Sequence, residues 1–309
     1  MQDNVTSAFW ARFGREPQVV VRAPGRVNLI GEHTDYNDGY VLPVALDRAA
    51  WIAAAPIEAL EARVYALDMQ SGVTFSLENI PPSDGNWADY PRGVAWALQE
   101  HGVPLVGMEA VLASNVPVGS GLSSSAAVEV AFAYTWQRLS GFRLSRRDLA
   151  LTCQRAENVY VGVNCGIMDQ MASALGVKGH ALLLDCRTLE TETVPLPKGV
   201  AIVVADTGVR RQLAASEYNV RRSQCERAVQ LLSADLPGIR ALRDVTLNDL
   251  ERLKKRLPEV IYRRARHVIS DNARVFQVKE ALQKGDLATV GALMRAGHIS
   301  LRDDYEVSS

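Results

Sequence analysis

The chain has 309 residues, of which 48% are hydrophobic and 22% charged, a balance typical of folded soluble domains and unlike that of disordered or membrane-embedded chains. Its 34 Lys and Arg against 35 Asp and Glu leave a net charge of −1, so no global positive charge draws it to nucleic acid or to an anionic membrane. The longest apolar stretches are far shorter than the roughly 20 residues of a bilayer span.

Neither a targeting segment nor a zinc site is indicated. The N-terminus lacks a basic region followed by an apolar core, so it does not resemble a secretory signal and the cytosol is the expected compartment. No cysteines form the short pairs of zinc sites, and no two histidines are spaced four residues apart. Free buried thiols are expected instead of disulfides. The residues concerned are Cys153, Cys165, Cys186, Cys225, His33, His101, His180, His267 and His298.

The first eighty residues are typical of short strands separated by turns, because apolar, β-branched and aromatic residues cluster between glycines and polar residues. Strands are predicted over residues 18–22, 40–46, 51–55, 63–67 and 73–77. The stretch from Gly31 to Gly39 is too polar for a core strand and predicts a loop. After residue 80 the pattern predicts a helix over 87–100, a strand over 108–114, a glycine-serine loop, and a helix over 123–139.

Helices dominate the second half of the sequence. Ser145 is the expected N-cap of the next helix, and a strand pair over 181–185 and 191–195 precedes a strand over 200–205. Further helices, each with a charged face typical of a solvated surface, are predicted over 216–232, 247–257, 262–282 and 287–296. Glycine and proline gather in residues 179–199, which predicts domains at 1–180 and 181–309.

The glycine-serine loop is a candidate anion site. It lies between a predicted strand and a predicted helix, where glycines let backbone amides close around a phosphate and the helix N-terminus adds positive potential. A tight turn followed by a serine cap remains open as an alternative. No Lys-Ser or Lys-Thr pair follows and a third glycine is missing, which excludes the P-loop and Rossmann patterns.

A polar cluster within residues 26–35 is a candidate sugar site, because a pocket that holds several hydroxyls in one stereochemistry needs fixed carboxylates and imidazoles. The cluster consists of Arg26, Asn28, Glu32, His33, Thr34 and Asp35. A solvated turn closed by Asn37, Asp38 and Gly39 is the alternative. The residues alone leave both interpretations open.

Four strings carry a family resemblance. PGRVNLIGEHTDYN at 24–37 resembles the galactokinase signature. GSGLSSSA at 119–126 is similar to the second motif of the superfamily named after galactokinase, homoserine kinase, mevalonate kinase and phosphomevalonate kinase (GHMP). CGIMDQ at 165–170 and SEYNVRR at 216–222 extend the resemblance over residues 19–305. It implies an α+β, two-domain GHMP-kinase fold with a β-rich N-terminal domain and a ferredoxin-like C-terminal domain.

The resemblance also implies roles for individual residues. The galactose pocket would be lined by Glu32, His33, Thr34, Asp35 and Tyr218. The ATP phosphates would be cradled by Gly119, Ser120, Gly121, Leu122, Ser123, Ser124 and Ser125. Mg²⁺ would be held by Ser125 and Glu157, and Trp87 and Tyr90 would lie near adenine. Asp169 would face the C1 hydroxyl of galactose, while Arg26 would bridge to Asp169 and the transferred phosphate.

Each of three assigned residues has a purely structural alternative. Asp169 begins a predicted helix, where a carboxylate often only complements the helix dipole. Glu157 is surrounded by polar residues and is open to interpretation as surface charge. Tyr218 lies in a charged helix and is open to interpretation as a core residue with its hydroxyl at the rim.

The implied activity is ATP-dependent phosphorylation of the anomeric hydroxyl of D-galactose to galactose 1-phosphate, by a cytosolic and monomeric enzyme of galactose catabolism. N-acetylgalactosamine kinase is one alternative. The other is a non-catalytic galactose and ATP sensor, which resembles the family without a Ser-Ala pair, whereas Ser125-Ala126 is present here. Because relatives continue past the match with a glycine-rich motif and further strands, we expect the C-terminal domain to be truncated, its sheet incomplete beside 200–205, and activity weak or absent.

Overall fold

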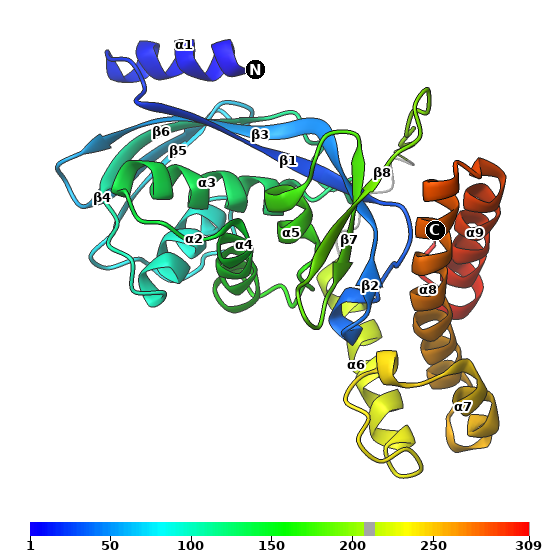
Figure 1. Ribbon diagram of the computed structural model, residues 1–309. Helices are drawn as coiled ribbons and strands as arrows, with labels where there is room; N and C mark the ends of the chain where they lie inside the picture. Colours follow the sequence, from blue (N-terminus) through cyan, green and yellow to red (C-terminus); the bar gives the residue numbers. More distant parts are fainter. Residues whose placement is uncertain (207–213, 309) are drawn as a thin grey trace. The chain divides into compact units, whose positions relative to one another are not determined.

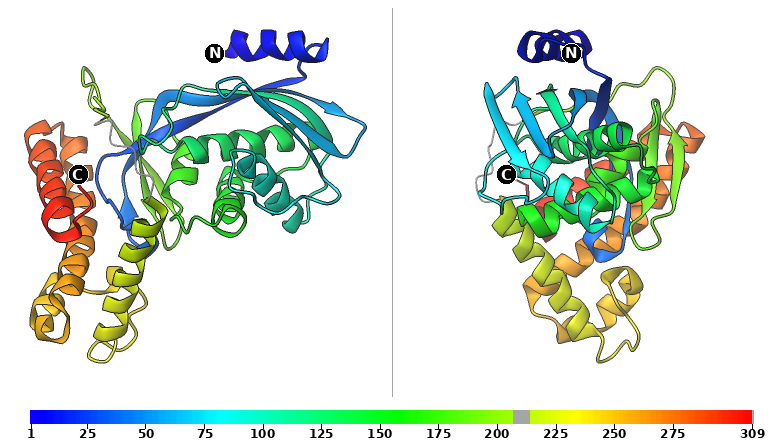
Figure 2. Two further views of the ribbon diagram at one scale, coloured as in Figure 1. Left: turned by 180° about the vertical axis from the view of Figure 1, so that it is seen from behind. Right: turned by 90° about the vertical axis from the view of Figure 1, so that its left-hand side faces the viewer.

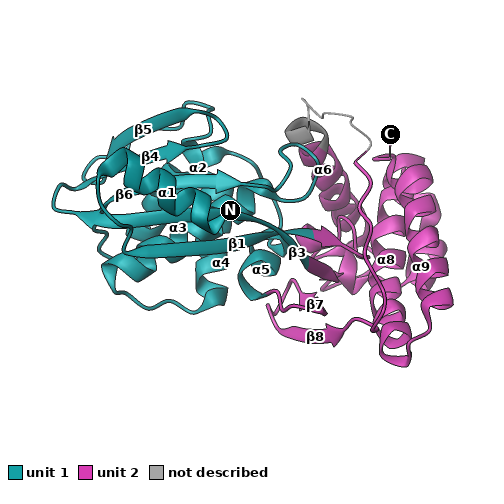
Figure 3. Cartoon of the chain, turned by 90° about the horizontal axis from the view of Figure 1, so that it is seen from above, with its two compact units in different colours: residues 1–26, 45–175 teal, residues 27–44, 176–309 magenta. Residues whose placement is uncertain are grey.

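The computed structural model describes residues 1–206 and 214–308, with side chains for all of these except 214–217. The chain forms two compact units: unit 1 comprises Met1–Arg26 and Ala45–Leu175, and unit 2 comprises Val27–Val44 and Gly176–Ser309 (Figure 3). The sequence-based division at residue 180 differs from these units mainly at residues 27–44. Residues 27–44, which include the polar loop, belong to unit 2.

Unit 1 is built on a five-stranded sheet of order β1-β3-β6-β4-β5. β3 is antiparallel to β6, β6 is parallel to β4, and β4 is antiparallel to β5. The strands are β1 (Val19–Asn28), β3 (Pro43–Ile57), β4 (Glu61–Ala66), β5 (Ser71–Ser76) and β6 (Gly107–Ser114). Two predicted strands fall largely in the single long β3, because Asp47 and Arg48, which interrupt the apolar pattern, are exposed within a continuous strand.

Helices cover both faces of this sheet (Figures 1 and 2). On one face lies α1 (Gln2–Phe13), whose Val5 and Phe9 pack on Ala53 and Val111 of the sheet. The other face carries α2 (Asp89–Glu100), α3 (Ser124–Ser140), α4 (Arg146–Arg155) and α5 (Met168–Leu175). Trp136 is fully buried in the core that these helices share with the sheet. The layers bring the end of β6, the start of α3 and the start of α5 into one compact unit.

Two local features of unit 1 matter for the site. Ser145 caps α4 as predicted, accepting a hydrogen bond of 3.0 Å from the backbone N–H of Asp148. α4 then continues into a π-helical turn, Ala156–Val161. Such turns occur frequently at functional sites because they re-aim the side chains they carry.

Unit 2 contains the antiparallel sheet β2-β7-β8, formed by β2 (Tyr40–Val41), β7 (His180–Asp185) and β8 (Thr191–Pro195). Its described helices include α6 (Ala214–Leu232), α7 (Leu247–Arg252), α8 (Glu259–Lys284) and α9 (Leu287–Ser300). The long α8 contributes Val268 to a core shared with α6 and α7, and Val275 to a core shared with the sheet. It therefore joins the two cores of this unit.

Two predictions for the second half were wrong. Residues 200–206 form no strand among the described residues, and Val203 is 88% exposed. An apolar run alone does not make a strand, because the backbone N–H and C=O groups also need a pairing partner. The predicted helix over 247–257 ends at Arg252 and is followed by a short 3₁₀ turn, Lys254–Arg256.

The mixed α+β architecture is confirmed, and the ferredoxin-like arrangement of the C-terminal domain stays a prediction. Within residues 1–206 and 214–308, no helix is long and apolar enough to cross a membrane. The four cysteines are free thiols, as predicted, but only Cys153 and Cys225 are fully buried.

Candidate active site

The glycine-serine loop connects β6 to α3 in unit 1. Gly119 and Gly121 have φ values of 72° and 76°, which residues with a Cβ rarely adopt. The loop approaches β1 closely, since the N–H of Arg26 donates to the carbonyl of Leu122 at 3.2 Å. A Cβ on Gly25 would lie only 2.6 Å from that carbonyl oxygen. Glycine at this position therefore permits the contact between strand and loop.

Asp169, in the first turn of α5, is clasped by two donors. Arg26 reaches its Oδ1 with Nη2 at 2.6 Å and with Nε at 2.8 Å. Ser123 donates its hydroxyl to Oδ2 at 2.5 Å. Arg26 also donates to the carbonyl of Gly121 at 2.6 Å. The contact expected between Arg26 and Asp169 is thus present, and the Asp169 side chain keeps 25% of its surface exposed.

A second acidic group lies buried in the same unit. The π-helical turn carries Glu157, which is only 6% exposed, and α3 carries Glu129, which is fully buried. The amide nitrogen of Gln170 donates to both carboxylates, at 2.6 Å to Glu157 and 3.1 Å to Glu129. The interpretation of Glu157 as surface charge was therefore wrong. Its backbone turn directs it into the unit instead of toward solvent.

Burial disfavours the charged form of both carboxylates. It raises the pKa of Glu157, and the negative charge of Asp169 raises that pKa further, while a hydrogen bond from Ser125 opposes the rise. Burial also raises the pKa of Glu129, with Glu157 as the next cause. A cation close to Glu157 would offset this unfavourable burial of negative charge.

The residues predicted for magnesium fit such an ion chemically. Ser125 acts on the charge of Glu157, and the two residues offer a hydroxyl and a carboxylate oxygen, the hard ligands that Mg²⁺ prefers. Across the described part of the chain, no group of three or more His, Cys, Asp or Glu side chains could hold a metal unaided. This donor set suits an ion that takes its remaining ligands from phosphate and water.

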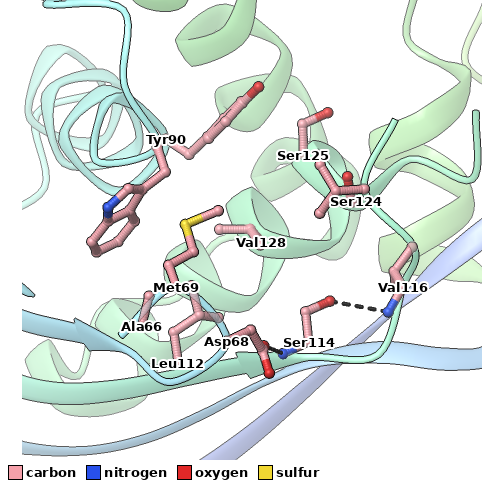
Figure 4. Close-up of a pocket in the computed structure, with 12 residues that line it drawn as sticks. Ala66, Asp68, Met69, Tyr90, Leu112, Ser114, Val116, Ser124, Ser125 and Val128 are labelled. Carbon is pink, nitrogen blue, oxygen red and sulfur yellow. Dashed lines mark hydrogen bonds between the residues drawn. The ribbon is translucent and has the colours of Figure 1, made fainter. Parts of the chain in front are cut away.

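An apolar pocket adjoins the start of α3 (Figure 4). It is lined by Ala66, Asp68, Met69, Trp87, Tyr90, Leu112, Ser114, Val116, Val118, Ser124, Ser125 and Val128. In the close-up, the labelled Tyr90 and Ser125 lie on the same side of the pocket, and Met69 lies near its centre. The aromatic side chains predicted for the base therefore share a pocket with two serines of the predicted phosphate loop. Met69 and Asp68 were not predicted, because the turn between β4 and β5 carries no recognisable motif.

In unit 2, the polar loop is held by α8. The carboxylate of Asp271 accepts hydrogen bonds from the backbone N–H groups of Gly31 and Glu32, each at 2.9 Å. His267 binds the carbonyl of Glu32 at 3.0 Å. Gly31 has φ 89°, and a Cβ there would lie 2.5 Å from the carbonyl oxygen of Tyr40. The loop backbone is thus fixed from outside by a helix some 240 residues further along the chain.

Thr34 is held inside the polar loop. Its side chain is fully buried, and its hydroxyl lies 2.8 Å from the carbonyl of Gly31 and 2.7 Å from that of Tyr40. The hydroxyl therefore holds the turn of the loop, and a role of Thr34 at the sugar stays a prediction.

His33 is anchored by a chain of hydroxyl groups. Its Nδ1 lies 2.9 Å from the hydroxyl of Tyr36, which lies 2.6 Å from the hydroxyl of Tyr305. Tyr305 is in turn 3.2 Å from the sulfur of Cys225. The ring of Tyr218 lies 5.6 Å from that of His33. Two residues predicted for galactose therefore lie together, and Glu32 and Asp35 are half-buried in the same loop.

The predicted site residues are divided between the units. Unit 1 carries Arg26, Trp87, Tyr90, the loop from Gly119 to Ser125, Glu157 and Asp169; unit 2 carries Glu32, His33, Thr34, Asp35 and Tyr218. Sequence reasoning missed the supporting residues Glu129, Gln170, Asp271, His267 and Tyr305. Only Gln170 lies inside one of the four strings, CGIMDQ at 165–170, and nothing local indicates what it contacts.

Two family models match parts of the chain. Residues 7–56 match the galactokinase galactose-binding signature, and residues 89–177 match the GHMP kinases N terminal domain. A galactokinase of a Roseiflexus species is 53% identical over 97% of this chain and 77% of its own length. That of Chloroflexus aurantiacus is 51% identical over 98% of this chain and 78% of its own.

A solved galactokinase structure is also similar to this chain. Lactococcus lactis galactokinase complexed with galactose has a TM-score of 0.90 and 32% identity, with 98% of this chain and 80% of that chain covered. The glycine loop, the α+β architecture and these matches define the chain as a GHMP kinase. Within that class, it belongs to the galactokinase family.

Proposed function

We propose that this chain transfers the γ-phosphoryl group of ATP to the anomeric hydroxyl of D-galactose, as a cytosolic and monomeric enzyme. The observation that carries the proposal is the clasp of Asp169 between Arg26 and Ser123, at the start of α5 and beside the glycine loop. This clasp sets a carboxylate and a guanidinium side by side. A sugar kinase needs a carboxylate to accept the proton of the sugar hydroxyl and a cation to stabilise the charge of the transferred phosphoryl group. The names of relatives at 51–53% identity support the substrate.

The chemistry is mostly positioning and charge stabilisation, because the transition state of phosphoryl transfer is loose and its charge spreads over the phosphoryl oxygens. The sugar oxygen bonds to the γ-phosphorus while the bond from that phosphorus to the β–γ bridging oxygen breaks and ADP leaves. Asp169 accepts the proton of the hydroxyl. Arg26 stabilises the phosphoryl charge and holds the Asp169 carboxylate in place through their ion pair.

The nucleotide is assigned to unit 1. Backbone amides of the loop from Gly119 to Ser125 bind its phosphates, aided by the N-terminus of the long helix α3. The apolar pocket with Trp87 and Tyr90 takes the adenine ring. Ser125 and Glu157 would hold Mg²⁺, which supplies neutralisation of phosphate charge when bound.

The sugar is assigned to the polar loop of unit 2. Glu32, His33 and Asp35 supply acceptors and donors for hydroxyls, and the ring of Tyr218 lies beside that of His33. The fixed backbone of the loop favours discrimination between sugar isomers. When the wrong isomer binds, polar groups that cannot move stay unpaired.

The nearest rival is an N-acetylgalactosamine kinase, which shares these motifs and differs in pocket volume around C2. A coupled assay of ADP release with each sugar, at saturating ATP and Mg²⁺, separates the two. We expect kcat/KM to be at least tenfold higher for D-galactose. A preference for N-acetylgalactosamine would favour the N-acetylgalactosamine kinase over the galactokinase.

A further inference from the structure

Ser123 occupies the N-cap position of α3 but does not cap the helix. An N-cap serine ordinarily accepts a hydrogen bond from a backbone N–H in the first turn. Ser145 does this for α4, at 3.0 Å. The Ser123 side chain makes no such bond to α3. Its hydroxyl donates instead to Oδ2 of Asp169, at 2.5 Å. Serine is a residue type that suits an N-cap, yet the hydroxyl of Ser123 binds a side chain of another helix, α5.

The backbone of Ser123 is also in an unfavourable conformation. Its φ and ψ are 57° and 52°, in the left-handed region, where N-cap residues do not normally lie and where a Cβ is penalised. The side chain is only 7% exposed. Neither the backbone nor the missing cap favours the stability of α3. Strained conformations of this kind persist where the surrounding structure fixes them, and they cluster at active sites.

The contact completes the hydrogen bonding of Asp169. Arg26 occupies Oδ1 and Ser123 occupies Oδ2, so the two donors, on different oxygens, fix the rotation of the carboxylate. The lone pairs that remain then have one direction in which to accept a proton. The Ser123 hydroxyl, a donor from the strained loop, thus orients the carboxylate that is expected to accept the proton. Correct orientation of this group matters more for a catalytic step than for folding.

We propose that Ser123 is a positioning residue for phosphoryl transfer, which orients the Asp169 carboxylate instead of binding the nucleotide phosphates with its side chain. The inference rests on the proposed function and assigns the hydroxyl of Ser123 a task different from that of its neighbours in the loop. Ser124 and Ser125, by contrast, line the pocket assigned to the nucleotide.

The first test compares Ser123→Ala, Ser123→Gly and the true cap variant Ser145→Ala. Both Ser123 variants should lose kcat by roughly ten- to a hundredfold, the usual effect of a lost hydrogen bond to a charged group, while KM for ATP stays within about twofold. Ser123→Gly should also melt above Ser123→Ala, because glycine relieves the left-handed strain. Ser145→Ala should melt about 2 °C lower than the wild type with unchanged kcat.

The second test is a double-mutant cycle with Asp169→Asn. If Ser123 acts through Asp169, Ser123→Ala should cost less than about threefold in kcat on the Asp169→Asn background, far less than its cost in the wild type. An equal cost on both backgrounds would overturn the proposal. So would a rise in KM for ATP at constant kcat, which would show that the hydroxyl binds the nucleotide.

Melting distinguishes the failure of this inference from that of the proposed function. If the wild type does not turn over galactose, melting still tests Ser123. Ser123→Ala should lower the melting midpoint of the wild type by more than it lowers that of an Asp169→Ala variant, because the hydroxyl acts through its hydrogen bond to Asp169. Equal lowering on both backgrounds would show that Ser123 acts independently of Asp169 and would overturn the inference.

Discussion

Single carboxylates in unit 1 have different environments and therefore different expected roles. Asp169 is partly exposed and paired with Arg26, whereas Glu129 and Glu157 are buried and share one amide donor from Gln170. A paired, accessible carboxylate suits proton acceptance, and a buried one beside a hydroxyl suits a cation. These assignments can be separated by isosteric substitutions that change charge and leave shape alone.

Replacing Asp169 with Asn keeps the size of the side chain and its ability to accept from Ser123, but removes its basicity. Turnover should fall by about a hundredfold or more, the usual contribution of a positioned general base. The thermal midpoint should stay within a few degrees of the wild type. Turnover near the wild-type value would mean that Asp169 only complements the dipole of α5.

Glu157→Gln replaces the only charged ligand assigned to Mg²⁺ with a neutral amide, so the Mg²⁺ concentration for half-maximal rate should rise about tenfold or more. Glu129→Gln is the matched control, since Glu129 is equally buried and bonded to the same Gln170 amide. Its Mg²⁺ dependence should not change. Titration of Mn²⁺ into the ATP-bound protein, followed by electron paramagnetic resonance, gives the same comparison without turnover. Equal effects of both variants would show that Glu157 is not a Mg²⁺ ligand.

Helix α8 is the element that organises unit 2. It carries Asp271 and His267, which fix the polar loop, and its two ends belong to different cores. A second tie joins the end of β7 to the 3₁₀ turn Leu242–Asp244, where Arg243 binds both oxygens of Asp185 at 2.5 and 2.7 Å. The position of the loop thus depends on elements far away in sequence.

Asp271→Ala would leave two backbone N–H groups of the loop without their acceptor. We expect a loss of roughly 2–4 kcal/mol in the free energy of unfolding and a rise in KM for galactose with little change in KM for ATP. Asp286→Ala, which removes the N-cap of α9 in the same unit, should cost about 1 kcal/mol and leave both KM values unchanged. Urea denaturation and steady-state kinetics measure these outcomes. An unchanged KM for galactose in Asp271→Ala would dissociate α8 from sugar binding.

The tie at Asp185 predicts a pH dependence. Burial raises the pKa of Asp185, but hydrogen bonds from Arg243 and from two backbone N–H groups outweigh it and lower the pKa to about 2, from an ordinary value of 3.8. A lowered pKa means that the folded state gains stability above the unfolded value, and that this gain is lost as the pH falls from about 4 toward 2. The difference in urea midpoint between wild type and Asp185→Asn should shrink over that range. A constant difference would contradict this source of stability.

The sequence predicted helices and strands well where neighbouring residues alone determine them. β8, Thr191–Pro195, lies where alternation predicted it, and Ser145 caps its helix. The strand expected over 200–205 failed, because pairing depends on a partner that periodicity does not contain. For the site, motifs located the loops, but the contacts of Asp271 and Tyr305 with residues 31–36 span more than 230 positions. No local pattern carries such contacts.

At the scale of the whole molecule, the chain spans 77–78% of the length of the Roseiflexus and Chloroflexus aurantiacus galactokinases. In the proposed function, nucleotide and proton chemistry are assigned to unit 1, and selection of the sugar to unit 2.

The most direct test of this account is ³¹P NMR of the purified protein with ATP, Mg²⁺ and either D-galactose or D-glucose. We predict that galactose yields a single phosphate ester at the anomeric position. Glucose should react at least tenfold more slowly, because the wrong C4 epimer leaves buried polar groups unpaired at roughly 1–3 kcal/mol each. Equal rates with both sugars, or phosphorylation at another hydroxyl, would contradict the assignment.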